Sequence, residues 1–218
     1  MPLSPSTLAL AVSALLAAGC SQGTAGPSPA DACKSLVAEC VGKQQACVAD
    51  AAGARCEACA DGQYAAASGA CEAIGGAALA HDFAPFTTKP GEEILGLCQS
   101  WTINNPTEMW VNAVQLDQDV ASHHSNWTFV PDDQFTGTDG VWMCQDRKYS
   151  QLTAALAGGV LYAQSTQATH EVQRFPNGAA VRVPPYSRII GDVHLLNTTW
   201  RRSPGTPGSP RTACPSRT

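Results

Sequence analysis

The chain has 218 residues and a formal net charge of -5, which argues against nucleic acid as a general partner because phosphate binding needs a basic surface. Charged residues make up only 14% of the chain, whereas roughly 25% is typical of soluble domains. Together with many Gly, Pro, Ser and Thr residues, this composition favours short strands and turns over long surface helices. Ten cysteines indicate an oxidising compartment in which disulfides persist.

The N-terminus has the features of an export signal. Residues 8–18 form an apolar run that is too short to span a bilayer, which needs about 20 residues, but has the length of a signal-peptide core. The run leads into Leu-Ala-Ala-Gly-Cys at residues 16–20, which resembles a bacterial lipobox. We therefore predict a lipoprotein signal peptide at residues 1–20 and lipidation of Cys20. The lipid would anchor the protein to a membrane of the cell envelope, facing the periplasm or the exterior. The alternative is a cysteine that merely follows a signal peptide, since residues 1–7 contain no Lys or Arg.

A flexible tether and a small disulfide-rich module are predicted next. Residues 21–32 are mostly Gly, Pro, Ser and Ala without periodicity, which is typical of a tether. Residues 33–73 have few large apolar side chains, so disulfides would have to replace an ordinary core. This stretch loosely resembles an EGF-like module, and its spacing leaves the disulfide connectivity open. A zinc site is the lesser alternative, because the Cys-x-x-Cys pair has no second close pair of ligands. The cysteines are Cys33, Cys40, Cys47, Cys56, Cys59 and Cys71.

Residues 80–199 are predicted to form an antiparallel β-sandwich. Short runs rich in Val, Ile, Trp and Thr alternate with turn residues, the pattern of such folds, and Gln151 to Ala157 is predicted as a short helix. Residues 200–218 have almost nothing to bury, so we expect them to be disordered and hypothesise an out-of-frame tail. The expected strands are 93–103, 109–116, 125–130, 141–144, 160–163, 179–183 and 189–195.

Three histidines are candidate metal ligands. His123 and His124 are adjacent, and His194 lies in a predicted strand seventy residues further on. Imidazole is a favoured ligand for copper and zinc. Adjacent side chains on a regular strand point to opposite faces, so one ion could use both only where the strand begins, ends or bulges. By spacing alone, the alternative of hydrogen-bonded surface or core histidines remains open.

Six short motifs occur in the order expected for one enzyme family, between about His81 and Thr199. The motifs are Leu97-Cys98-Gln99-Ser100, Ser122-His123-His124, Val141-Trp142-Met143-Cys144, Val160-Leu161-Tyr162-Ala163, Phe175-Pro176-Asn177-Gly178 with Val181-Arg182-Val183, and Val193-His194. Together they resemble the N-terminal domain of the type II, ascorbate-dependent copper monooxygenases, which hydroxylate peptidyl-glycine or dopamine.

The resemblance implies a mainly β fold, a jelly-roll-like antiparallel sandwich of about eight strands. It assigns His123, His124 and His194 to one electron-transfer copper ion per chain and pairs Cys98 with Cys144. It also implies a reductant such as ascorbate and an unknown small-molecule or peptide substrate.

The family's oxygen-activating copper site has no counterpart in this sequence. That site uses a His-x-His pair and a Met, but no His-x-His occurs and no histidine follows His194. Besides the initiator, only Met109 and Met143 are available, both within the predicted sandwich. We therefore expect a copper-binding monooxygenase domain that does not hydroxylate a substrate alone, so its status as an enzyme stays open. The alternatives are a copper-relay lipoprotein and a surface interaction module without catalysis.

Overall fold

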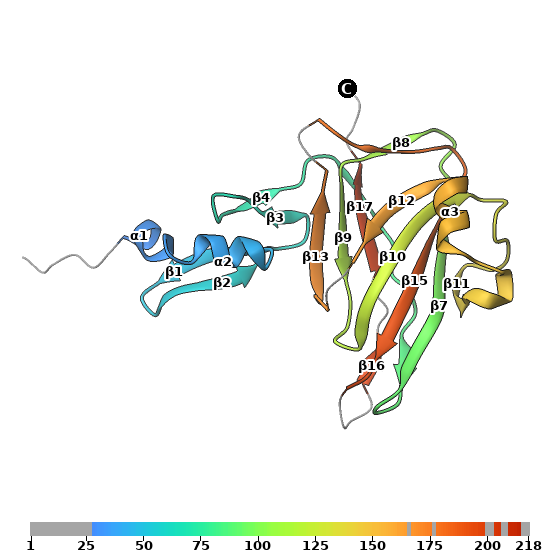
Figure 1. Ribbon diagram of the computed structural model, residues 1–218. Helices are drawn as coiled ribbons and strands as arrows, with labels where there is room; N and C mark the ends of the chain where they lie inside the picture. Colours follow the sequence, from blue (N-terminus) through green and yellow to red (C-terminus); the bar gives the residue numbers. More distant parts are fainter. Residues whose placement is uncertain (1–27, 165–166, 176–177, 199–202, 206–208, 215–218) are drawn as a thin grey trace, which may run out of the picture.

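The computed structural model describes residues 28–164, 167–175, 178–198, 203–205 and 209–214. The predicted signal peptide, Cys20 and most of the predicted tether lie outside these residues. The described chain is mainly β, with 48% strand and 12% helix, and its strands pair antiparallel. None of its helices is both long enough and apolar enough to cross a membrane. Figure 1 shows a small module that projects from one side of a larger β-sandwich.

The module begins with a short helix inside the predicted tether. The helix forms because the Ser28 side chain accepts a hydrogen bond from the Asp31 N–H and proline occupies the first turn, two features that favour a helix start. This helix overlaps the last residues of the range predicted as a tether, 21–32. The elements are α1 (Pro29–Cys33), α2 (Val37–Gly42) and two hairpins, β1 (Gln45–Asp50) with β2 (Gly53–Ala58) and β3 (Gln63–Ala65) with β4 (Cys71–Ala73).

Disulfides hold the module together, as its composition predicted. All six of its cysteines pair within it, as Cys33–Cys47, Cys40–Cys56 and Cys59–Cys71. Few of the module's hydrophobic side chains are buried, and Cys40 and Cys59 are among them. The disulfides therefore replace a conventional hydrophobic core.

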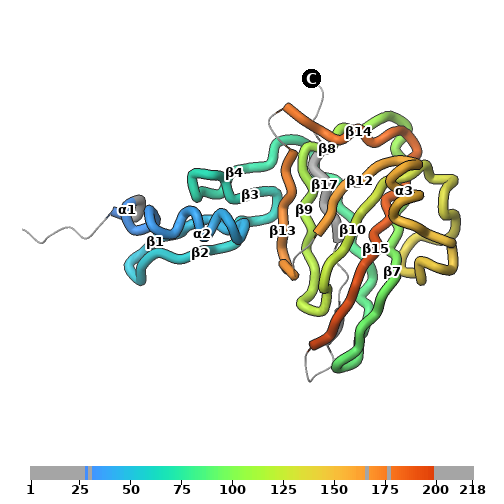
Figure 2. Tube along the Cα trace, in the orientation of Figure 1, coloured from blue at the N-terminus to red at the C-terminus, as the bar shows by residue number. Residues whose placement is uncertain are grey.

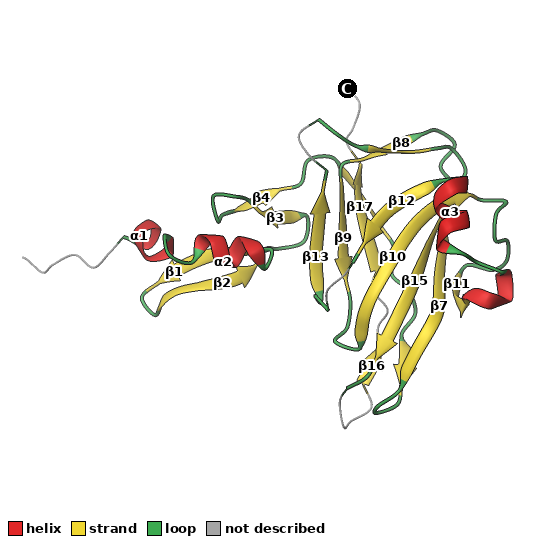
Figure 3. Cartoon of the chain, viewed as in Figure 1, coloured by secondary structure: helices red, strands yellow, loops and turns green. Residues whose placement is uncertain are grey.

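The sandwich consists of a five-stranded sheet facing a four-stranded sheet (Figures 1 and 3). The first sheet has the order β11 (Gly140–Met143), β7 (Glu93–Thr102), β15 (Ser187–Leu196), β10 (Ser122–Pro131) and β12 (Gly159–Ala163). The second has the order β13 (His170–Arg174), β9 (Ala113–Asp117), β17 (Ser209–Cys214) and β5 (Ala77–Ala80). Two short pairs complete the sandwich, β8 (Met109–Val111) with β14 (Val181–Val183) and β6 (Phe86–Thr88) with β16 (Ser203–Gly205).

The main core lies between the two sheets, and a second core covers the outer face of the five-stranded sheet. In the main core, Trp127 and Ile189 of the first sheet pack in one cluster with Val114 of the second. On the outer face, the 3-10 helix η1 (Cys144–Arg147) and α3 (Gln151–Ala157) cover Val130 and Ile190. The five-stranded sheet is therefore buried on both sides over much of its length.

One expected strand and the C-terminal segment depart from the sequence prediction. The strand expected over 109–116 is split at Asn112, because β8 pairs with β14, which lies beside it in Figure 2, whereas β9 pairs with β13. β9 also pairs with β17. Disorder was expected from residue 200 onwards, but β16 and β17 are strands there. Strand pairing uses backbone groups, so a segment with little to bury can still pair where two neighbours leave a gap, as β9 and β5 do around β17.

Candidate metal centre

Three histidine side chains converge on the outer face of the five-stranded sheet. His123 and His124 come from β10, and His194 comes from the neighbouring strand β15. One nitrogen from each ring lies within 4.8 Å of the others. The centroid of the His194 ring is 4.7 Å from the centroid of each of the other two rings. The adjacent pair and the remote histidine therefore meet in one cluster, as a shared ligand set requires.

A β-bulge brings the adjacent histidines to the same side of the sheet. Ser122 lies opposite Leu195, and His124 lies opposite His194, so two residues of β10 face one residue of β15. His123 is the extra residue of this bulge. In a regular strand the two imidazoles would point to opposite faces, so the irregularity is what allows both to serve one site.

A second bulge, on β7, faces His194 from its other side. Val193 pairs with Leu97 and Leu195 pairs with Ile94, so β7 contains one additional residue at this point. Gly96 has a φ of +68°, in the left-handed region that favours glycine. The bulge places Glu93 on the outer face, where its Oε1 lies 2.8 Å from Nε2 of His194.

The contact with Glu93 selects one nitrogen of His194 for ligation. When Nε2–H donates to the carboxylate, Nδ1 keeps its lone pair. Nδ1 of His194 lies 3.0 Å from Nε2 of His124. Two nitrogens that bind one ion at about 2.0–2.1 Å are separated by about 3–3.4 Å at right-angled to tetrahedral geometry. The two rings are therefore spaced for a common ion.

The third histidine is held by an amide from a different loop. The side-chain Nε2 of Gln167 is hydrogen-bonded to Nδ1 of His123. An ion bound at Nδ1 would take the place of this amide N–H, whereas an ion bound at Nε2 would leave it in position. Gln167 therefore influences which nitrogen of His123 is available.

Burial and the neighbouring histidines favour the neutral form of the His124 imidazole. Burial lowers the pKa of His124, the neighbouring His194 and His123 lower it further, and the carboxylate of Asp192 opposes these effects. Only a neutral imidazole has a lone pair to give to a metal, so the lowered pKa prepares His124 for ligation.

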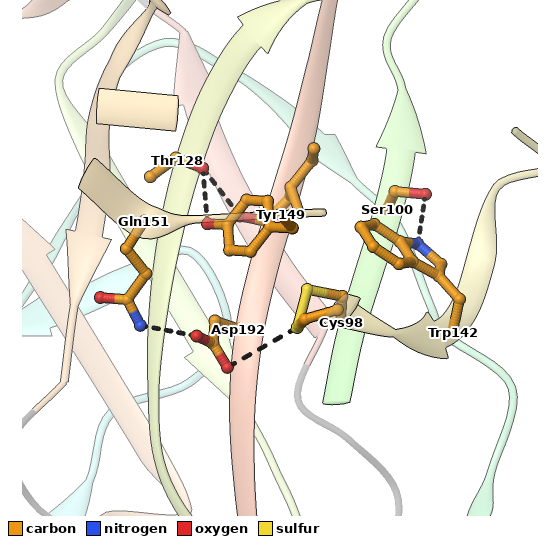
Figure 4. The surroundings of a disulfide bond; sticks show 9 residues. Cys98, Ser100, Thr128, Trp142, Tyr149, Gln151 and Asp192 are labelled. Carbon is orange, nitrogen blue, oxygen red and sulfur yellow. Dashed lines mark hydrogen bonds between the residues drawn. A yellow bond between two sulfur atoms is a disulfide. The ribbon is translucent and has the colours of Figure 1, made fainter. Parts of the chain in front are cut away.

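A disulfide lies on the same face of the sheet as the cluster. Cys98 of β7 is bonded to Cys144 of η1, as the family resemblance implied. Figure 4 shows Asp192 between this disulfide and Gln151, whose Nε2 donates to Asp192 Oδ2 at 2.7 Å. Asp192 lies opposite Cys98 in the ladder and two residues before His194 on β15. The disulfide therefore ties β7 to η1 close to the histidines.

The remaining candidates lie outside the cluster. His170 is in strand β13, and its Nδ1 lies 2.6 Å from Asp117 Oδ1. His81 stacks on Trp101 with a centroid distance of 4.7 Å. Met143 is exposed on β11.

Sequence reasoning did not find Glu93 and Gln167. Glu93 is 101 residues from His194 and Gln167 is 44 residues from His123. Neither belongs to a motif that would mark it, since their contacts depend on the second bulge and on the loop before β13.

No protein-family model matches the chain, and no curated protein sequence matches it significantly. The resemblance to the copper monooxygenases therefore depends on the short motifs in the sequence and on the histidine cluster.

Proposed function

We propose that the chain binds one copper ion through His123, His124 and His194 and serves as the electron-transfer domain of a copper-dependent monooxygenase. The observation that carries the proposal is the convergence of the three imidazoles, with candidate ligand atoms within 4.8 Å of one another. Glu93 orients His194, and the carboxylate–histidine contact is the usual outer-sphere partner of a ligating histidine.

The donor set favours copper. Imidazole nitrogens suit copper and zinc, and affinity for a given site rises to its maximum at Cu²⁺ in the divalent series. No thiolate or carboxylate belongs to the three-residue cluster found among the described residues. When bound, copper would supply a one-electron Cu(I)/Cu(II) couple, to be loaded by a reductant such as ascorbate.

The proposal assigns substrate hydroxylation to a second copper site that this sequence does not contain. No His-x-His motif is present, and His194 is the last histidine of the sequence. The chain alone is therefore proposed to accept and pass on electrons without hydroxylating its unknown small-molecule or peptide substrate. The proposed setting is the cell envelope, with a lipid at Cys20 as the membrane anchor.

Metal analysis of the purified protein tests the proposal. We expect about one copper per chain after incubation with Cu²⁺ and dialysis, and a Cu(II) electron paramagnetic resonance signal with nitrogen couplings. His194→Ala should lose this copper, whereas the control His81→Phe, which keeps a ring on Trp101, should retain it. No copper in the wild-type protein, or equal loss in both variants, would refute the proposed site.

Oxygen consumption separates the electron-transfer role from complete catalysis. Ascorbate should reduce the Cu(II) bound by the isolated chain to Cu(I), seen as bleaching of the paramagnetic signal, without oxygen consumption coupled to hydroxylation of a glycine-extended peptide or a phenethylamine. Hydroxylation of either substrate by the chain alone would contradict the assignment.

A further inference from the structure

The cysteine-rich module and strand β13 border two adjoining open hollows. Both hollows are lined by Gln44 of the module and His170 of β13. The first has a volume of about 280 Å³ and extends to Tyr64 and Arg174, and the second has a volume of about 330 Å³ and extends to Lys43 and Gln167. The space therefore exists only because the module packs beside the edge of the four-stranded sheet.

The lining of the first hollow is cationic and neutral. No aspartate or glutamate lines it, although the chain has a net charge of -5. Its cation is Arg174, whose guanidinium carbon lies 3.7 Å from the centroid of the Tyr64 ring. The charge of this lining is complementary to an anion.

Arg174 shares with Arg147, which stacks on Trp142, the lack of a carboxylate ion pair in the described part of the chain, whereas three other arginines of the fold have one. Arg55, Arg182 and Arg188 each form an ion pair with a carboxylate. Arg174 forms none with any residue in the described part of the chain. Its fork of N–H donors is therefore held against an aromatic ring without a carboxylate partner, although bidentate pairing with carboxylates is the characteristic use of this side chain.

Polar side chains surround the remaining space. Gln44 has a φ of +57°. Its Oε1 accepts a hydrogen bond from the Val172 N–H at 2.8 Å, which holds this side chain between the module and β13. His170 is held by Asp117, and the side chain of Gln63 completes the wall. These groups supply donors and acceptors for the hydroxyl or carboxyl groups of a small molecule.

We propose that the first hollow binds a small organic carboxylate, with one carboxylate group on Arg174 and the rest of the molecule toward Gln44, Gln63 and His170. A volume of about 280 Å³ fits a molecule the size of a short dicarboxylic or hydroxy acid. The site uses none of the three clustered histidines, so it stands or falls independently of copper binding.

Glutarate is a suitable probe, with uncharged glutaramide as its matched control. Titration of the full, metal-free chain, followed by amide NMR shifts, should give saturable changes confined to β13, α2 and the β3–β4 hairpin. Arg174→Gln should weaken glutarate binding about tenfold to a hundredfold, and Arg174→Lys should weaken it less. Arg182→Gln, which removes a paired arginine outside the hollow, should leave the affinity unchanged.

Three results would overturn the site. They are an absence of saturable shifts, equal binding of glutaramide, and equal weakening by the Arg174 and Arg182 variants. The NMR spectrum of Arg174→Gln shows whether this variant folds like the wild type. If the spectrum is altered throughout, Gln63→Ala serves as the second variant. It leaves the arginine in place and should still reduce the affinity for glutarate.

Discussion

His194 lies directly opposite His124 in the β10–β15 ladder, with Nδ1 of the first 3.0 Å from Nε2 of the second. Cross-strand neighbours are the closest side chains that two antiparallel strands can offer. The pair is therefore set by strand register, and His123 joins it only through the bulge beside it. A shift of register by one residue would dismantle the cluster, because it would turn His194 toward the core.

Replacing Glu93 with glutamine tests the outer-sphere contact. Glu93→Gln removes the charge that fixes the Nε2–H of His194, so we expect metal affinity to fall about tenfold to a hundredfold. Competition with a chelator of known affinity measures the change. The neighbouring Glu92→Gln is the control, because it removes the same charge one residue away. Equal losses in both variants would show that net charge, and not the contact, matters.

Removing the disulfide beside the histidines should cost stability. Cys98 and Cys144 are 46 residues apart in sequence and both are buried. By the chain-entropy relation, the Cys98→Ala/Cys144→Ala variant should lose about 4 kcal/mol of unfolding free energy. Urea unfolding followed by tryptophan fluorescence measures this. A loss below about 1 kcal/mol would mean that η1 is held mainly by its packing on Trp142 and Tyr149.

Gly191 marks the closest approach of β15 to the main core. A Cβ at this position would lie 2.6 Å from ring atoms of Trp127, which is fully buried. We expect Gly191→Ala to destabilise the fold by about 1–3 kcal/mol, because neither the ring nor the sheet has room to shift. Thermal unfolding measures the effect. Gly42→Ala is the control, since nothing lies within 4 Å of its added Cβ, and it should be neutral or slightly stabilising.

Alkaline pH should destabilise the protein through a buried tyrosine. Burial raises the pKa of Tyr149 from 10.0 to about 12, although the bond with Thr128 opposes this. Above pH 10 the unfolded chain loses this proton while the folded chain keeps it, so stability present below pH 10 is lost as pH rises toward 12. The loss should approach about 2 kcal/mol.

Chemical unfolding at pH 8 to 11.5 checks this expectation. Burial also raises the pKa of Tyr162, so some alkaline loss should remain when Tyr149 is changed to Phe. The Tyr149→Phe variant should nevertheless show a shallower decline than the wild type. Parallel curves for the two proteins would contradict the assignment to Tyr149.

Much of the sandwich could be predicted because its strands carry a strong pattern. The expected helix at Gln151 to Ala157 is confirmed at the same residues, and β7, β12 and β15 differ from their expected bounds by one or two residues. Strand β13 has the sequence His-Glu-Val-Gln-Arg, in which one apolar residue gives no alternation to detect. It forms because β9 supplies a partner edge, which only the tertiary structure reveals.

The three histidines of the candidate site could be predicted from the sequence, but the residue that contacts His194 could not. Adjacent histidines indicated that the strand begins, ends or bulges there, because a flat strand would separate them, and the structure has a bulge between Ser122 and His124. Glu93 was not predictable, because its position depends on an extra residue in β7 opposite His194. The extra residue of a bulge is hard to recognise in a single sequence. A glycine such as Gly96 is the main sign of it.

The hydrogen bond from Val172 N–H to Gln44 has a consequence for how this protein behaves in solution. β13 is the last strand of its sheet, and an open strand edge is a template for pairing with another molecule. The module covers part of this edge with the side chain of Gln44, which takes one backbone N–H of β13 as its hydrogen-bond donor. We expect this cover to reduce pairing with a second molecule. A shortened protein that starts at Ala77 would expose this border, so the sandwich and the module are best treated as one unit for expression and crystallisation.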